Sequence, residues 1–315
     1  PEGIARGVER LRRGDVVVFP TETVYGLGAD ALDASAVARV FEMKGRPSGN
    51  PLIVHVSGAE MAEDLASAWG EGTRALASAF WPGALTIVAP KAARVPGVVT
   101  GGGATVALRC PRHPVALALI EALGGPIVGP SANLSGRLSA TRAEHAAAAF
   151  AGEDLVVIDG GACRSGIEST VVDPSEDPAV VLRPGSVGID EIAAVLGRGV
   201  VFAGEVEGED GAARSPGRLG AHYRPATPVR VVERDELAGA GADVAALHWS
   251  GEAPGGAGGA VRLPGEARGF GAALYAALHE ADAMGLGVIW VESPPGDEKD
   301  AVRVAVMERL ARAGR

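Results

Sequence analysis

The chain has 315 residues, of which 47% are hydrophobic and 22% charged, a composition typical of a globular protein long enough for two domains. Its formal net charge of −10 argues against a protein that binds nucleic acid over a whole face, since such proteins usually carry a basic surface. A local positive pocket remains compatible with this balance. The two cysteines, Cys110 and Cys163, are far apart and fit a reducing cytoplasm better than a zinc site.

The sequence shows no sign of a membrane segment. Residues 2–19 are charged and amphipathic and lack the apolar core of a signal peptide. The longest apolar stretch, residues 75–90, is interrupted by Pro82 and Gly83, so it is not expected to span a bilayer. We therefore expect a cytoplasmic protein without membrane contact.

Two changes in composition divide the chain. Over residues 1–202, short runs rich in Val and Ile alternate with Ala-rich helical patterns, which predicts a first α/β domain. Residues 203–228 are dense in Gly, Pro and charge and show almost no apolar periodicity, so we interpret them as a linker. Residues 229–315 predict a second, smaller α/β domain.

The second domain has a simpler pattern. Apolar runs predict strands, and one long segment with helical periodicity, residues 267–285, lies before the last strand. The Gly-rich residues 251–259 predict a flexible loop and not a phosphate cradle, because no Lys-Ser/Thr pair follows them. The expected strands lie near residues 229–233, 243–249 and 286–292.

A helix and a loop in the first domain carry a basic pair. Asp33 is a suitable helix N-cap, and Gly45 suits the position just after the last turn. This helix would deliver Lys44 and Arg46 to a fixed place, although a basic helix end that faces water is the alternative. The buried stripe is expected to consist of Val37, Val40 and Phe41.

Four strand-like runs of the first domain stop at a proline, which cannot continue a central β-ladder. The residues at these ends are polar: Arg109 and Arg183 end two of the runs, and Ser131 and Asn133 follow a third. Ligands of open α/β sheets bind beyond the carboxyl ends of the strands, so we predict that an anionic small molecule binds where these ends converge. The alternative is that the arginines pair with surface carboxylates. The residues after the first run are Thr21, Glu22, Thr23 and Tyr25, and the four prolines are Pro20, Pro111, Pro130 and Pro184.

His55 lies in the strand that follows Pro51, where a histidine is more often a core residue than a ligand. A lysine, three arginines and several hydroxyls suit phosphoryl or nucleotidyl transfer, where catalysis depends on positioning and charge stabilisation. Neither a Walker motif nor the protein-kinase motifs are present, so a nucleotide would need another cradle.

The motifs taken together resemble the YrdC-type threonylcarbamoyl-AMP synthases. The resemblance starts near residue 4, is densest in the first 200 residues, and extends to a second domain typical of the long form. The last helix departs from the family pattern, because residues 294–314 lack the expected Gly-rich turn and Asn. The segments that carry the resemblance are, in order, PTETVYGLGADA, KGRPSGNPLIVHV, FWPGALTIV, VALRCP, GPSANLSG, GIESTVVD, VLRPGSVG and SPGRLGAHYRP.

The resemblance implies a twisted mixed sheet around a deep positive cavity, with a Rossmann-like second domain. It also implies a reaction in which L-threonine, bicarbonate and ATP give L-threonylcarbamoyladenylate and pyrophosphate. A separate tRNA threonylcarbamoyl transferase would use this product to modify tRNA beside the anticodon, so no stable nucleic-acid binding is expected of this chain. Mg²⁺ would arrive on the ATP phosphates, because the sequence offers no carboxylate cluster for a metal cage.

The resemblance also implies roles for single residues. Lys44 and Arg46 would face the phosphates and the carboxylated amine as catalytic groups. The segment with His222 and Tyr223 would fold over the nucleotide. The implied threonine site consists of Thr23, His55, Arg109, Ser169 and the backbone at Gly129. The implied ATP site consists of Arg46, Asn50, Thr105, Ser131, Asn133, Ser139, Arg183, His222 and Tyr223.

Two alternatives from other functional classes remain open. A module that binds double-stranded RNA would use the same Lys-x-Arg and Ser-x-Asn residues on a concave surface, but the acidic total charge disfavours it. A carbamoyltransferase of the hydrogenase-maturation type resembles the first domain, but it would need Cys-rich zinc motifs, and this chain has two cysteines.

Overall fold

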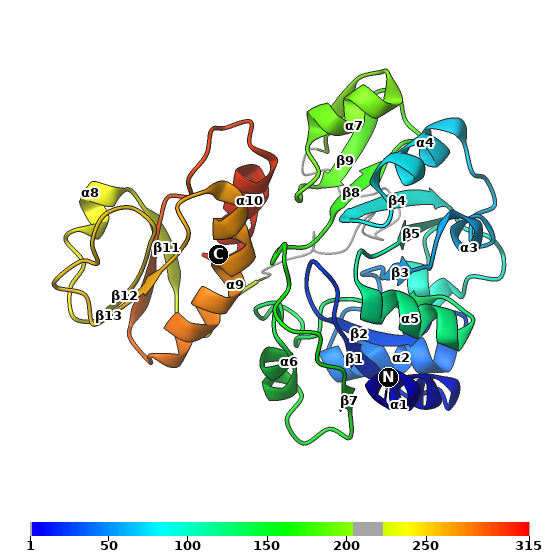
Figure 1. Ribbon diagram of the computed structural model, residues 1–315, viewed down its shortest axis with the longest axis horizontal. Coiled ribbons are helices and arrows are strands. Elements are labelled where there is room, and N and C mark those ends of the chain that lie inside the picture. The colour runs from blue at the N-terminus through cyan, green and yellow to red at the C-terminus, as the bar shows by residue number, and fades with distance from the viewer. Residues whose placement is uncertain (1, 204–222, 315) are drawn as a thin grey trace.

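Two α/β units form the described part of the computed structural model, residues 2–203 and 223–314 (Figure 1). Residues 204–222, most of the predicted linker including His222, lie outside the described residues. The predicted mixed α/β sheet with a second, smaller α/β domain is confirmed, and the structure adds that the second sheet is parallel.

A ten-stranded mixed sheet runs through the first unit in the order β10-β9-β8-β4-β5-β3-β6-β2-β1-β7. Its strands are short and rich in Val and Ile, which suit buried pleated positions. They are β1 (Val17–Phe19), β2 (Gly26–Asp30), β3 (Ile53–His55), β4 (Leu85–Pro90), β5 (Thr105–Arg109), β6 (Ile127–Val128), β7 (Val156–Val157), β8 (Thr170–Asp173), β9 (Ala179–Arg183) and β10 (Val200–Phe202).

Helices cover this sheet and build separate cores with it. One core packs α1 and α5 against β1, another packs α2 and α3 against β2 and β3, and a third packs α4 and α7 against β4 and β8. The helices are α1 (Glu2–Arg12), α2 (Ala34–Lys44), α3 (Ala59–Glu63), α4 (Glu71–Phe80), α5 (Pro114–Leu123), α6 (Ala143–Ala149) and α7 (Ile189–Leu196), with a 3₁₀ turn η1 (Gly97–Thr100).

The helix α2 forms as its sequence predicts. The Asp33 carboxylate accepts hydrogen bonds from the backbone N–H groups of Ser35 and Ala36, and Gly45 ends the helix with a φ of 59°. The predicted stripe of Val37, Val40 and Phe41 is buried. The pair Lys44 and Arg46 is buried too, so the alternative of a basic helix end facing water is wrong.

The four strands that stop at proline do not run in one direction. The pairings orient β1 and β6 one way and β5 and β9 the other. The prediction of one shared carboxyl edge is therefore wrong, because that rule holds for parallel strands and this sheet is mixed. The polar residues at these ends nevertheless meet in one cavity, described below.

The second unit is a four-stranded parallel sheet in the order β11-β14-β12-β13. Its predicted strands and long helix are confirmed, whereas β13 was not predicted because it begins at the glycine that ends the Gly-rich stretch and pairs only with β12. The helices α9 and α10 lie between this sheet and the first unit (Figure 1). The elements are β11 (Val229–Val232), α8 (Arg234–Leu237), β12 (Val244–His248), β13 (Gly259–Arg262), α9 (Ala267–Ala283), β14 (Val288–Glu292) and α10 (Ala301–Ala313).

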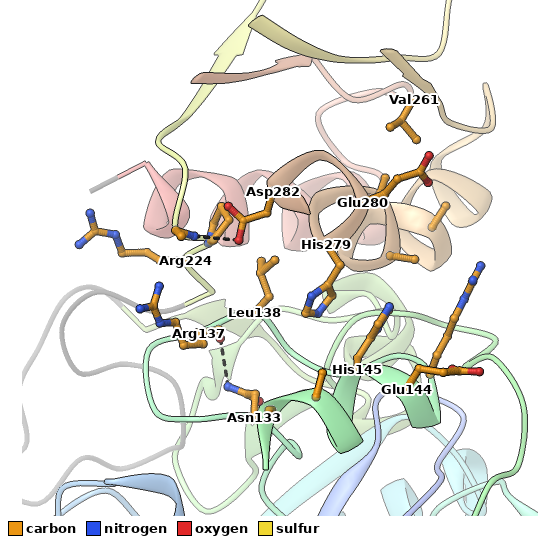
Figure 2. Close-up of a pocket in the computed structure, with 18 of the residues that line it drawn as sticks. Asn133, Arg137, Leu138, Glu144, His145, Arg224, Val261, His279, Glu280 and Asp282 are labelled. Atoms are coloured by element: carbon orange, nitrogen blue, oxygen red, sulfur yellow. Dashed lines mark hydrogen bonds between the residues drawn. The ribbon is translucent and has the colours of Figure 1, made fainter. Parts of the chain in front are cut away.

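The two units pack closely through α9. A Cβ atom added at Gly166 would lie 2.3 Å from the backbone oxygen of Ala272, so only a glycine permits this approach. Farther along α9, His279 Nε2 lies 3.2 Å from the backbone oxygen of Ser139, and its ring stacks on that of His145 with centroids 4.0 Å apart (Figure 2). The interface between the two units therefore contains two titratable side chains, His145 and His279.

This histidine pair predicts an acid-sensitive domain interface. Burial, then the charges of His279 and Arg142, lower the pKa of His145 to about 4, and burial also lowers the pKa of His279. The folded state thus prefers neutral rings, so their contribution to stability is complete above about pH 6.5 and is lost as the pH falls toward 4. When the pH is lowered from 7.5 to 5, we expect the thermal unfolding midpoint to decrease less in His145→Gln than in the parent protein.

The exposed neighbour Glu280 on α9 supplies the control. Glu280→Gln alters the same helix surface but leaves the stacked rings in place, so its thermal midpoint should follow the parent's pH dependence. An unchanged pH dependence in both His145→Gln and His279→Gln would contradict the interpretation of the pair.

Candidate functional site

A narrow cavity gathers nine of the predicted site residues, eight from the first unit and Tyr223 from the start of the second. The space that the lining encloses is about 40 Å³, well below the roughly 300–1,000 Å³ of small-molecule sites. The cavity is therefore narrower than the deep cavity that the resemblance implies. The nine residues are Thr23, Arg46, His55, Arg109, Gly129, Ser131, Ser169, Arg183 and Tyr223.

Neighbouring strands place His55, Arg109 and Gly129 together. His55 pairs with Arg109 across β3 and β5, and Gly129 follows β6, the strand on the other side of β3. A Cβ atom at residue 129 would lie 2.7 Å from the His55 ring, which explains the need for glycine there. Burial, then the charge of Arg109, lowers the pKa of His55 well below its ordinary value, so the ring is neutral. Its Nδ1 is buried and has no hydrogen-bond partner in the protein.

The guanidinium of Arg109 is held on three sides. It donates to the hydroxyl of Thr23 at 2.8 Å and to the backbone oxygen of Gly83 at 3.1 Å, and it forms an ion pair of 2.8 Å with Glu22. Burial alone would raise the pKa of Glu22, but the charge and hydrogen bond of Arg109 outweigh it and lower that pKa. The cavity thus contains an arginine that already contacts a carboxylate.

Arg183 and Ser169 form a second polar group in the cavity. Arg183 Nε and one terminal nitrogen donate to the backbone oxygen of Ser169 at 3.1 and 3.0 Å. The Ser169 hydroxyl lies 2.7 Å from that of Thr86. Burial lowers the pKa of Arg183, and burial lowers that of Arg46 to about 10, so both remain cationic at neutral pH.

Arg46 and Lys44 have different surroundings. Arg46 lines the cavity and donates to the backbone oxygens of Asn50 and Pro51. Lys44 is 2% exposed and lies outside the lining, where its Nζ donates to the backbone oxygens of Ser131 and Asn133. Burial, then Arg46, lowers the pKa of Lys44 well below its ordinary value. Through these two hydrogen bonds, Lys44 holds the Ser131–Asn133 turn against the end of α2.

Five predicted residues are not in the cavity lining. Thr105 is exposed at the start of β5, and Asn50 and Asn133 are buried with side-chain oxygens that lack a protein partner. Ser139 is also buried and donates to Glu168 at 2.6 Å, so it touches the lining indirectly. The fifth is Lys44, and His222 lies outside the described residues.

Three functional candidates were missed as site residues. Glu168 lines the cavity, Glu22 pairs with Arg109, and Arg309 of α10 pairs with Glu168 at 3.2 Å. Glu22 and Glu168 lie inside the motifs, directly before the predicted threonine-site residues Thr23 and Ser169. This adjacency was a signal that the sequence offered. Arg309 offered none, because it lies 141 residues from its partner.

A second, larger pocket of about 870 Å³ lies between the two units (Figure 2). Of the predicted site residues it includes only Asn133. Its charged side chains, including Arg137, Arg224, Glu144 and Asp282, carry both signs. The smaller cavity is the better candidate site despite its volume, because the buried cations and hydroxyls converge there.

Within the described residues, no three or more His, Cys, Asp or Glu side chains form a group suited to a metal ion. No helix in the described part of the chain has both the length and the hydropathy needed to cross a bilayer.

The fold and the cavity define a two-domain α/β protein with an arginine-rich buried site. The family model Sua5/YciO/YrdC, described as telomere recombination, matches residues 9–185. A model described as the C-terminal domain of threonylcarbamoyl-AMP synthase matches residues 187–314. The chain therefore belongs to the Sua5/YciO/YrdC family of enzymes, in the two-domain form of the threonylcarbamoyl-AMP synthases.

Relatives match over most of the chain. The threonylcarbamoyl-AMP synthase of Pyrococcus abyssi is 43% identical over 96% of this chain and 91% of its own length. That of Bacillus subtilis is 46% identical over 73% of this chain and 66% of its own length. The crystal structure of P. abyssi Sua5 complexed with L-threonine superposes with a TM-score of 0.89 at 41% identity, covering 99% of this chain and 94% of that one.

The surroundings of Lys44 predict a structural effect of its removal. Lys44→Met leaves two backbone oxygens without their donor, each at a cost of roughly 1–3 kcal/mol, so we expect the free energy of unfolding to fall by about 2–6 kcal/mol. Urea denaturation measures this change. Arg39→Met, on the exposed side of the same helix, should change it by less than about 1 kcal/mol. Equal stability of the two variants would refute the assignment.

Proposed function

We propose that this chain makes L-threonylcarbamoyladenylate and pyrophosphate from L-threonine, bicarbonate and ATP. The observation that carries this proposal is one buried cavity with a carboxylate-binding arginine at one place and two further arginines, a hydroxyl and a tyrosine at another. The relatives named for this activity, and the threonine complex of one of them, support it.

The threonine half of the proposed site centres on Arg109. A guanidinium can bind a carboxylate through two parallel hydrogen bonds, and the ion pair with Glu22 supports a carboxylate-binding role for Arg109. Thr23 and the neutral ring of His55 would read the polar groups of the amino acid, and Ser169 and the backbone at Gly129 would complete the subsite. Because His55 is neutral, it can accept as well as donate a hydrogen bond.

The nucleotide half would use Arg46, Ser131, Arg183 and Tyr223, with Asn50, Thr105, Asn133 and Ser139 as further contacts. The cations would stabilise the charge that develops as the carboxylated amine of threonine attacks the α-phosphorus and pyrophosphate leaves. Lys44 would act by holding the Ser131–Asn133 turn in place.

ATP would bring Mg²⁺ on its phosphates, where the ion neutralises charge on the leaving pyrophosphate. Glu168, which lines the cavity, and Glu22, which pairs with the cavity residue Arg109, already have arginine partners, which favours a metal carried by the nucleotide over one held by the protein. The threonine amine would condense with bicarbonate, with loss of water, so bicarbonate would supply the carbonyl carbon of the carbamate.

The product would pass to a separate transferase that modifies tRNA beside the anticodon. Stable nucleic-acid binding by this chain is not part of the proposal, because the cavity arginines are buried and could not reach the phosphates of a duplex. A cytoplasmic location is in keeping with Cys110 and Cys163, which are both buried free thiols.

Pyrophosphate release tests the proposal directly. The complete mixture of ATP, threonine and bicarbonate should release pyrophosphate, and omission of any one substrate should abolish the release. Release that needs no threonine would point to another nucleotide reaction and would overturn the proposal.

Substitution of Arg109 tests the division of the cavity. Arg109→Ala would leave the carboxylate of bound threonine buried and unpaired, at a cost of roughly 3–5 kcal/mol. The value of kcat/KM for threonine should therefore fall by about two to three powers of ten. Arg109→Lys keeps the charge but loses the planar fork, and it should give an intermediate value. ATP binding, measured by calorimetric titration, should stay nearly unchanged.

The ion pair with Glu22 requires a stability control. The double variant Glu22→Gln/Arg109→Met removes both buried charges, so it should be more stable than Arg109→Ala but equally poor in threonine use. If Arg109→Ala folds and loses ATP binding while threonine binding survives, Arg109 belongs to the phosphate site.

A further inference from the structure

The second domain contributes a buried arginine that pairs with Glu168, a residue of the cavity wall. Arg309 comes from α10, is 1% exposed, and directs its Nε toward a carboxylate oxygen of Glu168 at 3.2 Å. One terminal nitrogen donates to the backbone oxygen of Pro184 at 2.6 Å. An arginine buried this deeply is costly unless it is paired, so its partners indicate what the contact stabilises.

Glu168 connects this arginine to the predicted substrate residues. Its other carboxylate oxygen accepts from the Ser139 hydroxyl at 2.6 Å, and Tyr275 of α9 donates to the oxygen that faces Arg309 at 3.1 Å. Glu168 is also adjacent in sequence to Ser169 and lines the cavity. Burial would raise its pKa, but Arg309 and then Arg183 lower it, so the carboxylate is ionised.

Tyr223 is held by the same group of side chains. Its ring lies 5.8 Å from that of Tyr275, and the Arg309 guanidinium lies 5.7 Å from its centroid, within cation–π range. The backbone of Tyr223 has a φ of 64°, which a non-glycine residue keeps only where its surroundings hold it. The ring is 1% exposed and lines the cavity.

We propose that Arg309 is a positioning residue for the nucleotide half of the site, through which the second domain sets the places of Glu168, Ser139 and Tyr223. This inference rests on the proposed function, because that function assigns Ser139 and Tyr223 to ATP. The threonine half contains no contact with Arg309: its anchors Arg109 and Thr23 bind Glu22 and each other.

This separation distinguishes positioning from simple domain docking. If Arg309 only joined the two domains, its loss would lower the amount of folded enzyme and hence kcat, or would weaken both substrates alike. A positioning role predicts a selective effect on ATP. We expect Arg309→Met to raise KM for ATP and the ATP dissociation constant by roughly 10–100-fold, the cost of one or two hydrogen bonds to a charged group, while KM for threonine changes less than about threefold.

Two further variants keep the test decisive if Arg309→Met does not fold. Arg309→Lys retains the cation near Glu168 and Tyr223 and should restore part of the ATP affinity. Glu168→Gln keeps the side-chain volume but removes the charge that orders Arg309 and Ser139, and it should reproduce the ATP defect. Arg303→Met on the same helix removes an arginine that donates to the backbone oxygen of Pro294 within the second unit, and it should leave both KM values near those of the parent.

The readouts separate the two proposals. If the parent protein binds ATP in calorimetric titration but releases no threonine-dependent pyrophosphate, the proposed function fails, while the ATP affinities of the variants still decide the role of Arg309. If the parent protein is active and the Arg309 and Glu168 variants keep the parental KM for ATP, the inference is overturned. Parallel losses for ATP and threonine would also overturn it, in favour of domain docking alone.

Discussion

Burial of charge is the constraint on which the rest of this structure depends. The first domain encloses Arg46, Arg109 and Arg183 in one small cavity, and an isolated buried ion costs several kcal/mol. Each cation therefore needs oxygen partners from the protein. Arg109 has a carboxylate partner in Glu22, Arg46 donates to backbone oxygens, and Arg183 donates to the backbone oxygen of Ser169 and interacts electrostatically with Glu168. Around the cavity the cations Arg46, Arg109 and Arg183 outnumber the carboxylates Glu22 and Glu168, which favours an anionic ligand.

The mixed sheet explains how so many polar groups meet. In a parallel sheet, the residues after successive strands lie along one edge. Here β5 and β9 run opposite to β1 and β6, so Arg109 and Arg183 reach the cavity from one direction while Thr23 and Ser131 reach it from the other. Opposed strand ends surround a ligand on two sides, and they bring a guanidinium and the hydroxyl of Thr23 within 2.8 Å of each other.

Local features of the fold were predictable because their causes are local. The N-cap at Asp33, the end of α2 at Gly45 and the strand ends at prolines depend on residues within one turn or one strand. Strand direction, the edge strand β13 and the pairing of Glu168 with Arg309 depend on distant segments, and no periodicity encodes them. The site residues were predicted through motif resemblance, and the structure adds which of them share the cavity and which, like Lys44, support it from behind.

The interdomain contacts explain why the second domain packs where it does. The buried carboxylate of Glu168 is stable in the cavity wall only if a nearby cation neutralises it. Arg183 supplies part of that charge, but it also lines the cavity. Arg309 supplies that charge from α10, and Tyr275 supplies a hydrogen bond from α9. Both partners come from helices that cover the face of the second sheet nearest the first domain (Figure 1). The charge of Glu168 in the cavity wall and the packing of α9 and α10 therefore depend on each other. A change in either domain that alters Glu168 or Arg309 acts on the other domain through this pair.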